Sequence, residues 1–123
     1  MAPRREQADE TEAFLPLPTA VFHILVALAD RDRHGYSIMQ DVSARTDGKV
    51  RLSAGTLYSA VARMLEQGLI EEPRENPDPD NDDERRRHYR VTRLGRDVAV
   101  AEARRLQDML SQARATGLIP RKL

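Results

Sequence analysis

The sequence predicts a mainly α-helical (α+β) fold in which three short helices precede a two-stranded hairpin and one long helix follows it. Apolar residues recur at helical spacing in three segments between residues 19 and 67. Two short alternating segments flank a stretch rich in Pro and Asp at residues 75–84. Before Gly117, Ala and Leu recur every three or four positions, as in a long amphipathic helix.

Composition limits the classes of function. The chain has 123 residues, enough for one domain, and its 20 Lys and Arg balance 20 Asp and Glu. Because it has no cysteine, disulfides and thiolate chemistry are excluded. The polar segment 1–12 does not resemble a signal peptide, and the longest apolar run, Ile24–Ala29, is too short to span a bilayer. We therefore expect a cytoplasmic protein that does not associate with membranes.

The first part of the chain is expected to hold an arm and a helix. Residues 1–13 contain little that could be buried, which predicts a disordered N-terminal arm. A helix should begin at Thr19 or Pro18. Its apolar stripe follows the spacing i, i+3, i+4, i+7 in Val21, Ile24, Leu25 and Leu28.

A second helix is expected from about Gly35 to Arg45. The run Thr46-Asp47-Gly48 has the residue types of a turn and should end it. The following residues, Lys49–Leu52, could form a very short strand.

The third helix has the clearest signals. Ser53 is a natural N-cap, and Gly68 stands where a left-handed C-terminal cap is expected. The apolar stripe that should face the core consists of Leu57, Ala60, Val61, Met64 and Leu65. At 100° per residue the outward face is then Gly55, Thr56, Ser59, Ala62, Arg63 and Glu66, with Tyr58 on the flank.

The remaining elements are two strands and a helix. The strands are predicted at Leu69–Arg74 and Arg86–Val91, with Tyr89 directed to the core and residues 75–84 as the hairpin tip. Thr92 can cap a helix that runs to about Thr116. Its heptad-like seam consists of Ala99, Ala103, Leu106, Leu110 and Ala113.

This order of elements is that of a winged helix-turn-helix over residues 14–92, followed by a long C-terminal helix at 93–117 and a tail at 118–123. The outward face of the third helix is slim and hydroxylic in its first turns, so it can enter the major groove of DNA. Residues 85–96 contain six arginines and no acid, whereas residues 78–84 contain five acids. The neutral total therefore hides separated blocks of charge.

Four short motifs resemble the PadR family of bacterial transcriptional regulators over about residues 17–100. They are His34-Gly35-Tyr36-Ser37-Ile38, Ala54-Gly55-Thr56-Leu57-Tyr58, Leu65-Glu66-Gln67-Gly68-Leu69-Ile70, and Arg85-Arg86-Arg87-His88-Tyr89-Arg90-Val91-Thr92 with Gly95. The resemblance implies a homodimeric repressor whose third helix reads the major groove while the wing approaches the minor groove or the backbone. It also implies that Tyr36 and Tyr58 contact phosphates and that the C-terminal helix packs on the partner.

The residues expected to contact double-stranded DNA lie at the start of the second helix, on or just before the third helix, and on the wing. They are Tyr36, Arg51, Ser53, Gly55, Thr56, Tyr58, Ser59, Arg63, Arg85, Arg86, Arg87 and His88. Ser59 and Arg63 are the candidates for base edges, because an arginine fork suits guanine. Other interpretations stay open: both tyrosines can be core residues, Ser53 and Thr56 can be caps only, and the arginines can pair with the acidic tip.

The operator is expected to be an inverted repeat that a two-fold dimer binds. The expected dimer interface consists of Phe22, Leu106, Met109, Leu110 and Ala113. One hypothesis is that a small apolar effector binds between the first and last helices and releases the DNA, although the same side chains suit an ordinary dimer seam. The rival function is a winged-helix protein-interaction module without specific DNA binding.

Enzymatic and metal chemistry have no supporting pattern. The three histidines, His23, His34 and His88, are scattered and lack a fixed set of carboxylates at ligand spacing. No nucleophile, base and acid occur in an arrangement that would support catalysis. We therefore expect no cofactor, no metal and no enzymatic activity.

Overall fold

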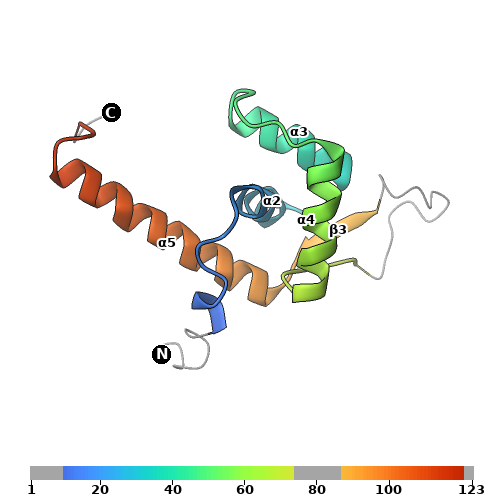
Figure 1. Ribbon diagram of the computed structural model, residues 1–123. Helices are drawn as coiled ribbons and strands as arrows, with labels where there is room; N and C mark the ends of the chain where they lie inside the picture. Colours follow the sequence, from blue (N-terminus) through green and yellow to red (C-terminus); the bar gives the residue numbers. More distant parts are fainter. Residues whose placement is uncertain (1–9, 74–86, 121–123) are drawn as a thin grey trace.

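The computed structural model describes residues 10–73 and 87–120 (Figure 1). Its helices are α2 (Thr19–Asp30), α3 (Gly35–Arg45), α4 (Ala54–Gln67) and α5 (Arg93–Ala115), and its strands are β1 (Arg33–His34), β2 (Ile70–Glu71) and β3 (His88–Val91). The strands form an antiparallel sheet in the order β1-β3-β2. All four predicted helices are present, and the mainly helical winged helix-turn-helix with its long C-terminal helix is confirmed.

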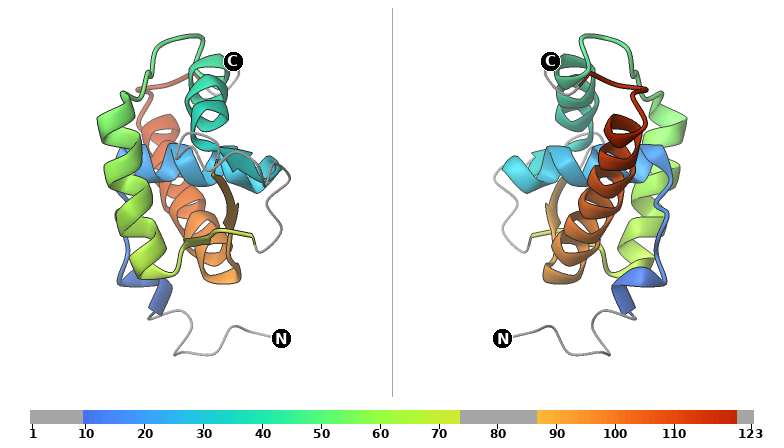
Figure 2. Two further views of the ribbon diagram at one scale, coloured as in Figure 1. Left: turned by 90° about the vertical axis from the view of Figure 1, so that its right-hand side faces the viewer. Right: turned by 90° about the vertical axis from the view of Figure 1, so that its left-hand side faces the viewer.

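Helix α2 lies at the centre of the fold. It crosses the middle of the molecule in both views of Figure 2 and contacts α3, α4, α5 and β3. Its sequence is apolar on more than one side, and its buried residues are Val21, Ile24, Leu25, Ala27 and Leu28. These buried residues make α2 the helix against which α3, α4, α5 and β3 pack.

The cap residues of α4 behave as the sequence predicts. The hydroxyl of Ser53 accepts the N–H of Thr56 at 3.1 Å, and Gly68 ends the helix with φ 76°. Leu57, Val61 and Met64 are buried against the core. The stripe therefore anchors α4 by one side and leaves its other side at the surface.

The strand predicted over residues 49–52 is wrong. These residues form a loop in which the hydroxyl of Thr46 accepts the N–H of Val50 at 3.0 Å. The backbone of the loop thus bonds to a side chain rather than to a neighbouring strand. Asp47 and Gly48 turn the chain with φ 53° and 77°.

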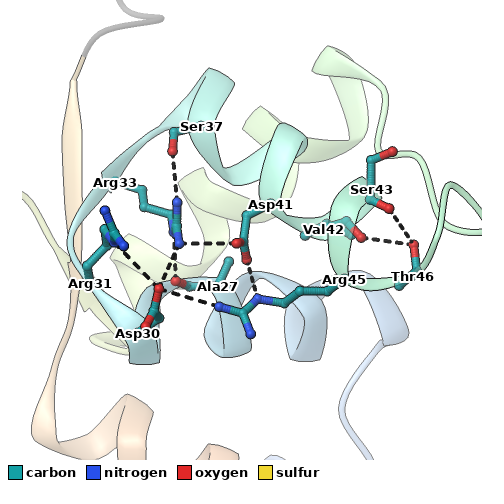
Figure 3. A network of polar contacts seen from close by, with 10 residues as sticks. All are labelled: Ala27, Asp30, Arg31, Arg33, Ser37, Asp41, Val42, Ser43, Arg45 and Thr46. Carbon is teal, nitrogen blue, oxygen red and sulfur yellow. Dashed lines mark hydrogen bonds and ion pairs between the residues drawn. The ribbon is translucent and has the colours of Figure 1, made fainter.

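The third strand of the sheet is β1, for which the sequence predicts no strand. Its two residues are too few to show alternation, and the Arg33 side chain holds them in place (Figure 3). The Arg33 guanidinium donates to the carbonyl of Ala27 at 3.0 Å, to Ser37 Oγ at 3.1 Å and to Asp30 Oδ2 at 2.9 Å. It also pairs with Asp41 at 3.1 Å, so one side chain joins the end of α2 to α3.

Strands β2 and β3 are shorter than predicted within the described residues, and Tyr89 on β3 is buried, as predicted. The predicted hairpin tip at 75–84 lies outside the described residues, as do residues 1–9 of the predicted arm. Residues 10–12 form a helical turn rather than part of a disordered segment, because Phe14 and Leu15 pack against the core just after them.

Helix α5 is covered over its first half only. Thr92 caps it by accepting the N–H of Gly95 at 3.0 Å, and the buried residues are Gly95, Val98 and Glu102. Beyond Glu102 the helix projects away from the other elements (Figure 1). No helix in the described part of the chain is long and apolar enough to cross a membrane.

Glu102 is buried, and both of its carboxylate oxygens accept hydrogen bonds. Its Oε2 accepts the N–H of Leu17 at 2.9 Å, and both of its oxygens accept from the Arg105 guanidinium. The hydrogen bond from Arg105 lowers the pKa of the Glu102 carboxyl, burial opposes this shift, and the Leu17 N–H adds to the lowering. The carboxylate therefore ties α5 to the segment that leads into α2.

We predict that Gly95→Ala strongly destabilises the fold. A Cβ at this position would lie 2.0 Å from the carbonyl oxygen of Leu69, which is backbone and cannot rotate away. Overpacking of this kind costs about 1–3 kcal/mol or more of unfolding free energy, measurable by urea denaturation. Gly55→Ala is the matched control, since nothing lies within 4 Å of its Cβ position and alanine favours a helix. Equal stability of the two variants would contradict the close approach of Gly95 to the Leu69 carbonyl.

We also predict that Glu102 makes the stability depend on acid. A carboxyl whose pKa is lowered on folding stabilises the protein above its ordinary pKa of about 4.5, and this stabilisation is lost as pH falls through the lower folded value. The difference in unfolding free energy between wild type and Glu102→Gln should be largest near neutral pH and shrink below about pH 4.5. Asp97→Asn, at an exposed carboxylate of α5, is the control. If the difference in unfolding free energy between wild type and Glu102→Gln does not change with pH, the ionised Glu102 carboxylate does not stabilise the fold.

Candidate nucleic-acid interface

The outward face of α4 lies at the surface. Gly55, Thr56, Ser59, Ala62, Arg63 and Glu66 are all exposed, as the 100° periodicity predicts. No large side chain stands on the first two turns of this face. A helix of this shape can approach the edges of base pairs in a groove about 12 Å wide.

An open hollow of about 400 Å³ lies between this face and the start of α2. It is lined by Pro18, Ala20, Val21, Gly55, Thr56, Ser59, Ala60 and Arg63. Pro18 is the N-cap residue of α2, and no side-chain hydrogen bond caps this helix. Sequence reasoning missed this neighbour of α4, because only tertiary packing brings residues 18–21 to residues 55–63.

The two tyrosines differ in their surroundings. Tyr36, in the first turn of α3, is 54% exposed. Tyr58 is half-buried, and a Cβ on Gly35 would lie 2.6 Å from its hydroxyl oxygen. The glycine therefore lets Tyr58 pack against the start of α3, which supports the core-edge interpretation of its ring.

The arginines separate into paired and unpaired groups. Among the described residues, no carboxylate lies within ion-pair distance of Arg51 or Arg63, and both are exposed. Arg90 donates to Asp32 from Nε at 3.1 Å and from Nη2 at 2.9 Å, so it joins β3 to the residue before β1. Arg87 lies 3.7 Å from Glu72. Arg85 and Arg86 lie outside the described residues.

His88 has a neighbour that the sequence did not predict. It pairs with His34 across β1 and β3, and the two rings meet edge to face with centroids 5.6 Å apart. His34 also caps α3, since its Nδ1 accepts the N–H of Ser37 at 3.1 Å. Within the described ranges, no group of three or more His, Asp or Glu side chains could hold a metal ion.

The predicted dimer residues on α5 form an apolar stripe at the surface. Leu106 is 39% and Met109 53% exposed, while Leu110 and Ala113 are half-buried. They continue the helix face that carries Val98 and Glu102 in the covered half. Phe22, on α2, is half-buried and packs against the core.

Comparison with known proteins agrees with this geometry. Residues 24–101, more than half of the chain, match the model of the transcriptional regulator PadR-like family. A protein of Lysinibacillus sphaericus without an assigned function is 33% identical over 73 residues, which make up 59% of this chain and 64% of that protein. The chain thus spans less than two thirds of that relative's length.

Solved structures share the fold. A transcriptional regulator from Clostridium thermocellum superposes with a TM-score of 0.65 at 22% identity, covering 91% of this chain and 97% of the regulator. A PadR family transcription regulator from hypervirulent Clostridium difficile gives 0.65 at 23% identity, covering 80% and 98%. The regulator BldR from Sulfolobus solfataricus gives 0.62 at 18% identity, covering 96% and 74%. Together, the family match and the winged helix show that the chain belongs to the PadR-like family of transcriptional regulators.

Proposed function

We propose that this protein is a homodimeric repressor that binds an inverted-repeat operator through α4. The observation that carries the proposal is the exposed α4 face, which is free of bulky residues over its first two turns. It bears Arg63, which pairs with no carboxylate among residues 10–73 and 87–120. In this proposal Ser59 and Arg63 contact base edges, with Arg63 directed at a guanine. A DNA partner also places the protein in the cytoplasm, the compartment that holds a bacterial chromosome.

Phosphate contacts would surround the α4 face. Arg51 stands just before α4, and Tyr36 presents its ring on α3. Ser53, Gly55 and Thr56 begin α4, where backbone N–H groups and the positive end of the helix dipole favour an anion. We assign Tyr58 to this group through its hydroxyl, and we assign Arg85, Arg86, Arg87 and His88 to the wing contact. These contacts would supply most of the affinity through release of counterions.

The exposed stripe on α5 supports the dimer. The same helix face is buried by the body of the protein up to Glu102, and further along it exposes Leu106 and Met109 and half-exposes Leu110 and Ala113. Leaving these apolar side chains in water forgoes about 25 cal/mol for each Å² that a partner could cover. A second copy packed on this stripe, and on Phe22, would complete the core and set two α4 helices about 34 Å apart.

Release by an effector belongs to the same proposal. A small apolar molecule lodged beside Phe22, Leu106, Met109 and Leu110 would change the distance between the two α4 helices. Thermal-shift screening with hydrophobic compounds tests this step, and a compound that raises the melting temperature while lowering DNA affinity supports it.

We predict that Arg63→Ala weakens binding and relaxes base preference. Loss of one bidentate arginine–guanine contact costs about 1–3 kcal/mol, and the affected position should become indifferent to the base. Fluorescence anisotropy with duplexes from the DNA upstream of the protein's own gene measures both effects. Arg104→Ala is the charge-matched control, because Arg104 is exposed on α5. If the two variants lose affinity equally, Arg63 reads no base.

We further predict that Met109→Glu converts the dimer to a monomer. A charge buried in an apolar interface without a partner is strongly unfavourable, so association should be lost at micromolar concentration. Val100→Glu is the matched control, since Val100 is an exposed apolar residue (44%) on a different face of α5. Light scattering measures the mass of each variant. A monomeric wild type, or a dimeric Met109→Glu protein, would contradict the proposed interface.

A further inference from the structure

Glu102 stands where an apolar residue would be the simplest choice. Among the described residues it is the one charged side chain in the core, with 2% of its surface exposed. It lies on the same face of α5 as Val98. Burial of a carboxylate costs free energy unless hydrogen bonds compensate, and an apolar side chain would avoid this cost. The position therefore calls for an explanation beyond packing.

The hydrogen bond to Leu17 gives that explanation. Leu17 lies between Pro16 and Pro18 in a segment without regular structure. Its buried N–H donates to Glu102 Oε2 at 2.9 Å across 85 positions of sequence. Phe14 and Leu15 of the same segment donate their N–H groups to backbone carbonyls, so they do not need α5. Glu102 thus holds the segment at one specific point.

That point adjoins the hollow beside α4. Pro18, the residue after Leu17, begins α2 and lines the hollow together with Thr56, Ser59 and Arg63. A shift of Leu17 along α5 would move Pro18 and the first turn of α2 against the outward face of α4. We therefore expect the hydrogen bond between Leu17 and Glu102 to contribute to the width of the hollow.

Arg105 connects the Glu102 carboxylate to the exposed stripe of α5. Arg105 donates to both oxygens of Glu102 and lies 3.2 Å from Met109 Sδ through its Nη1. Arg105 is accordingly placed between the buried carboxylate and an apolar residue of the proposed dimer interface. A partner that covers Met109 would also contact the group that orients Glu102.

We propose that Glu102 is a positioning residue for the α4 face. It holds the start of α2 at the distance from α4 that DNA binding requires, and through Arg105 it connects the start of α2 to the α5 stripe. The proposal rests on the proposed function. The carboxylate does not touch DNA; it acts through Leu17 and Pro18.

The test compares Glu102→Leu, which removes the acceptor, with Glu102→Gln, which keeps an oxygen for the Leu17 N–H. Anisotropy is measured on the upstream duplex and on a scrambled duplex of the same composition, well below each melting temperature. Glu102→Leu should lose about tenfold in affinity for the upstream duplex and keep its affinity for the scrambled one, whereas Glu102→Gln should keep most of the preference. Asp97→Asn, the charge control, should match wild type.

The outcomes separate the two proposals. A wild type without preference for the upstream duplex overturns the proposed function and this inference with it. A wild-type preference that Glu102→Leu retains overturns the inference alone, and so does a Glu102→Gln variant as weak as Glu102→Leu. If Glu102→Leu does not fold, Arg105→Gln decides, since Arg105 is partly exposed. If Arg105→Gln lowers the preference for the upstream duplex by about threefold, the inference is supported, and an unchanged preference overturns it.

Discussion

The fold depends on the burial of one helix against four other elements. Helix α2 is surrounded by α3, α4, α5 and β3, and Ile24, Leu25 and Ala27 are fully removed from solvent. A chain of this length can build only one core of this kind, because small domains bury a limited share of their surface. Each surrounding helix therefore gives one apolar side to α2 and keeps the opposite side at the surface. For α4 that opposite side is the proposed DNA face. Helix α5 differs, because its second half projects beyond the reach of α2 and leaves its apolar face uncovered there.

Local signals explain why the helices could be predicted and the tertiary contacts could not. Ser53 and Gly68 mark the ends of α4 by chemistry that acts within four residues, and the periodicity of its stripe orients the exposed face. Strand β1 has no such signal, because two residues show no period and their position depends on Arg33 reaching Ala27 and Asp41. The hollow beside α4 and the bond from Leu17 to Glu102 join residues far apart in sequence, so no local pattern could indicate them.

The arginines fall into two groups, those that pair with carboxylates and those that do not, and this difference explains how a chain of zero net charge can suit DNA. Arg33, Arg45 and Arg90 are held by carboxylates and tie α2, α3 and the sheet together. Arg51 and Arg63 lack such partners in the described part of the chain and flank or occupy the α4 face. Because paired charges contribute little electrostatic potential at a distance, Arg51 and Arg63 would dominate the potential that a polyanion experiences near α4. Asp30, Asp32 and Asp41 thus serve the scaffold, and the neutral net charge of the chain does not argue against DNA binding.

The central claim is that two copies of α4 read successive major grooves. Selection of bound duplexes from a random DNA library, followed by sequencing, tests it most directly. The account predicts an enriched inverted repeat whose half-site centres lie about 10 base pairs apart, with a guanine in each half-site that becomes variable when Arg63 is replaced. Recovery of no enriched sequence, or of an enriched sequence without two-fold symmetry, would contradict it.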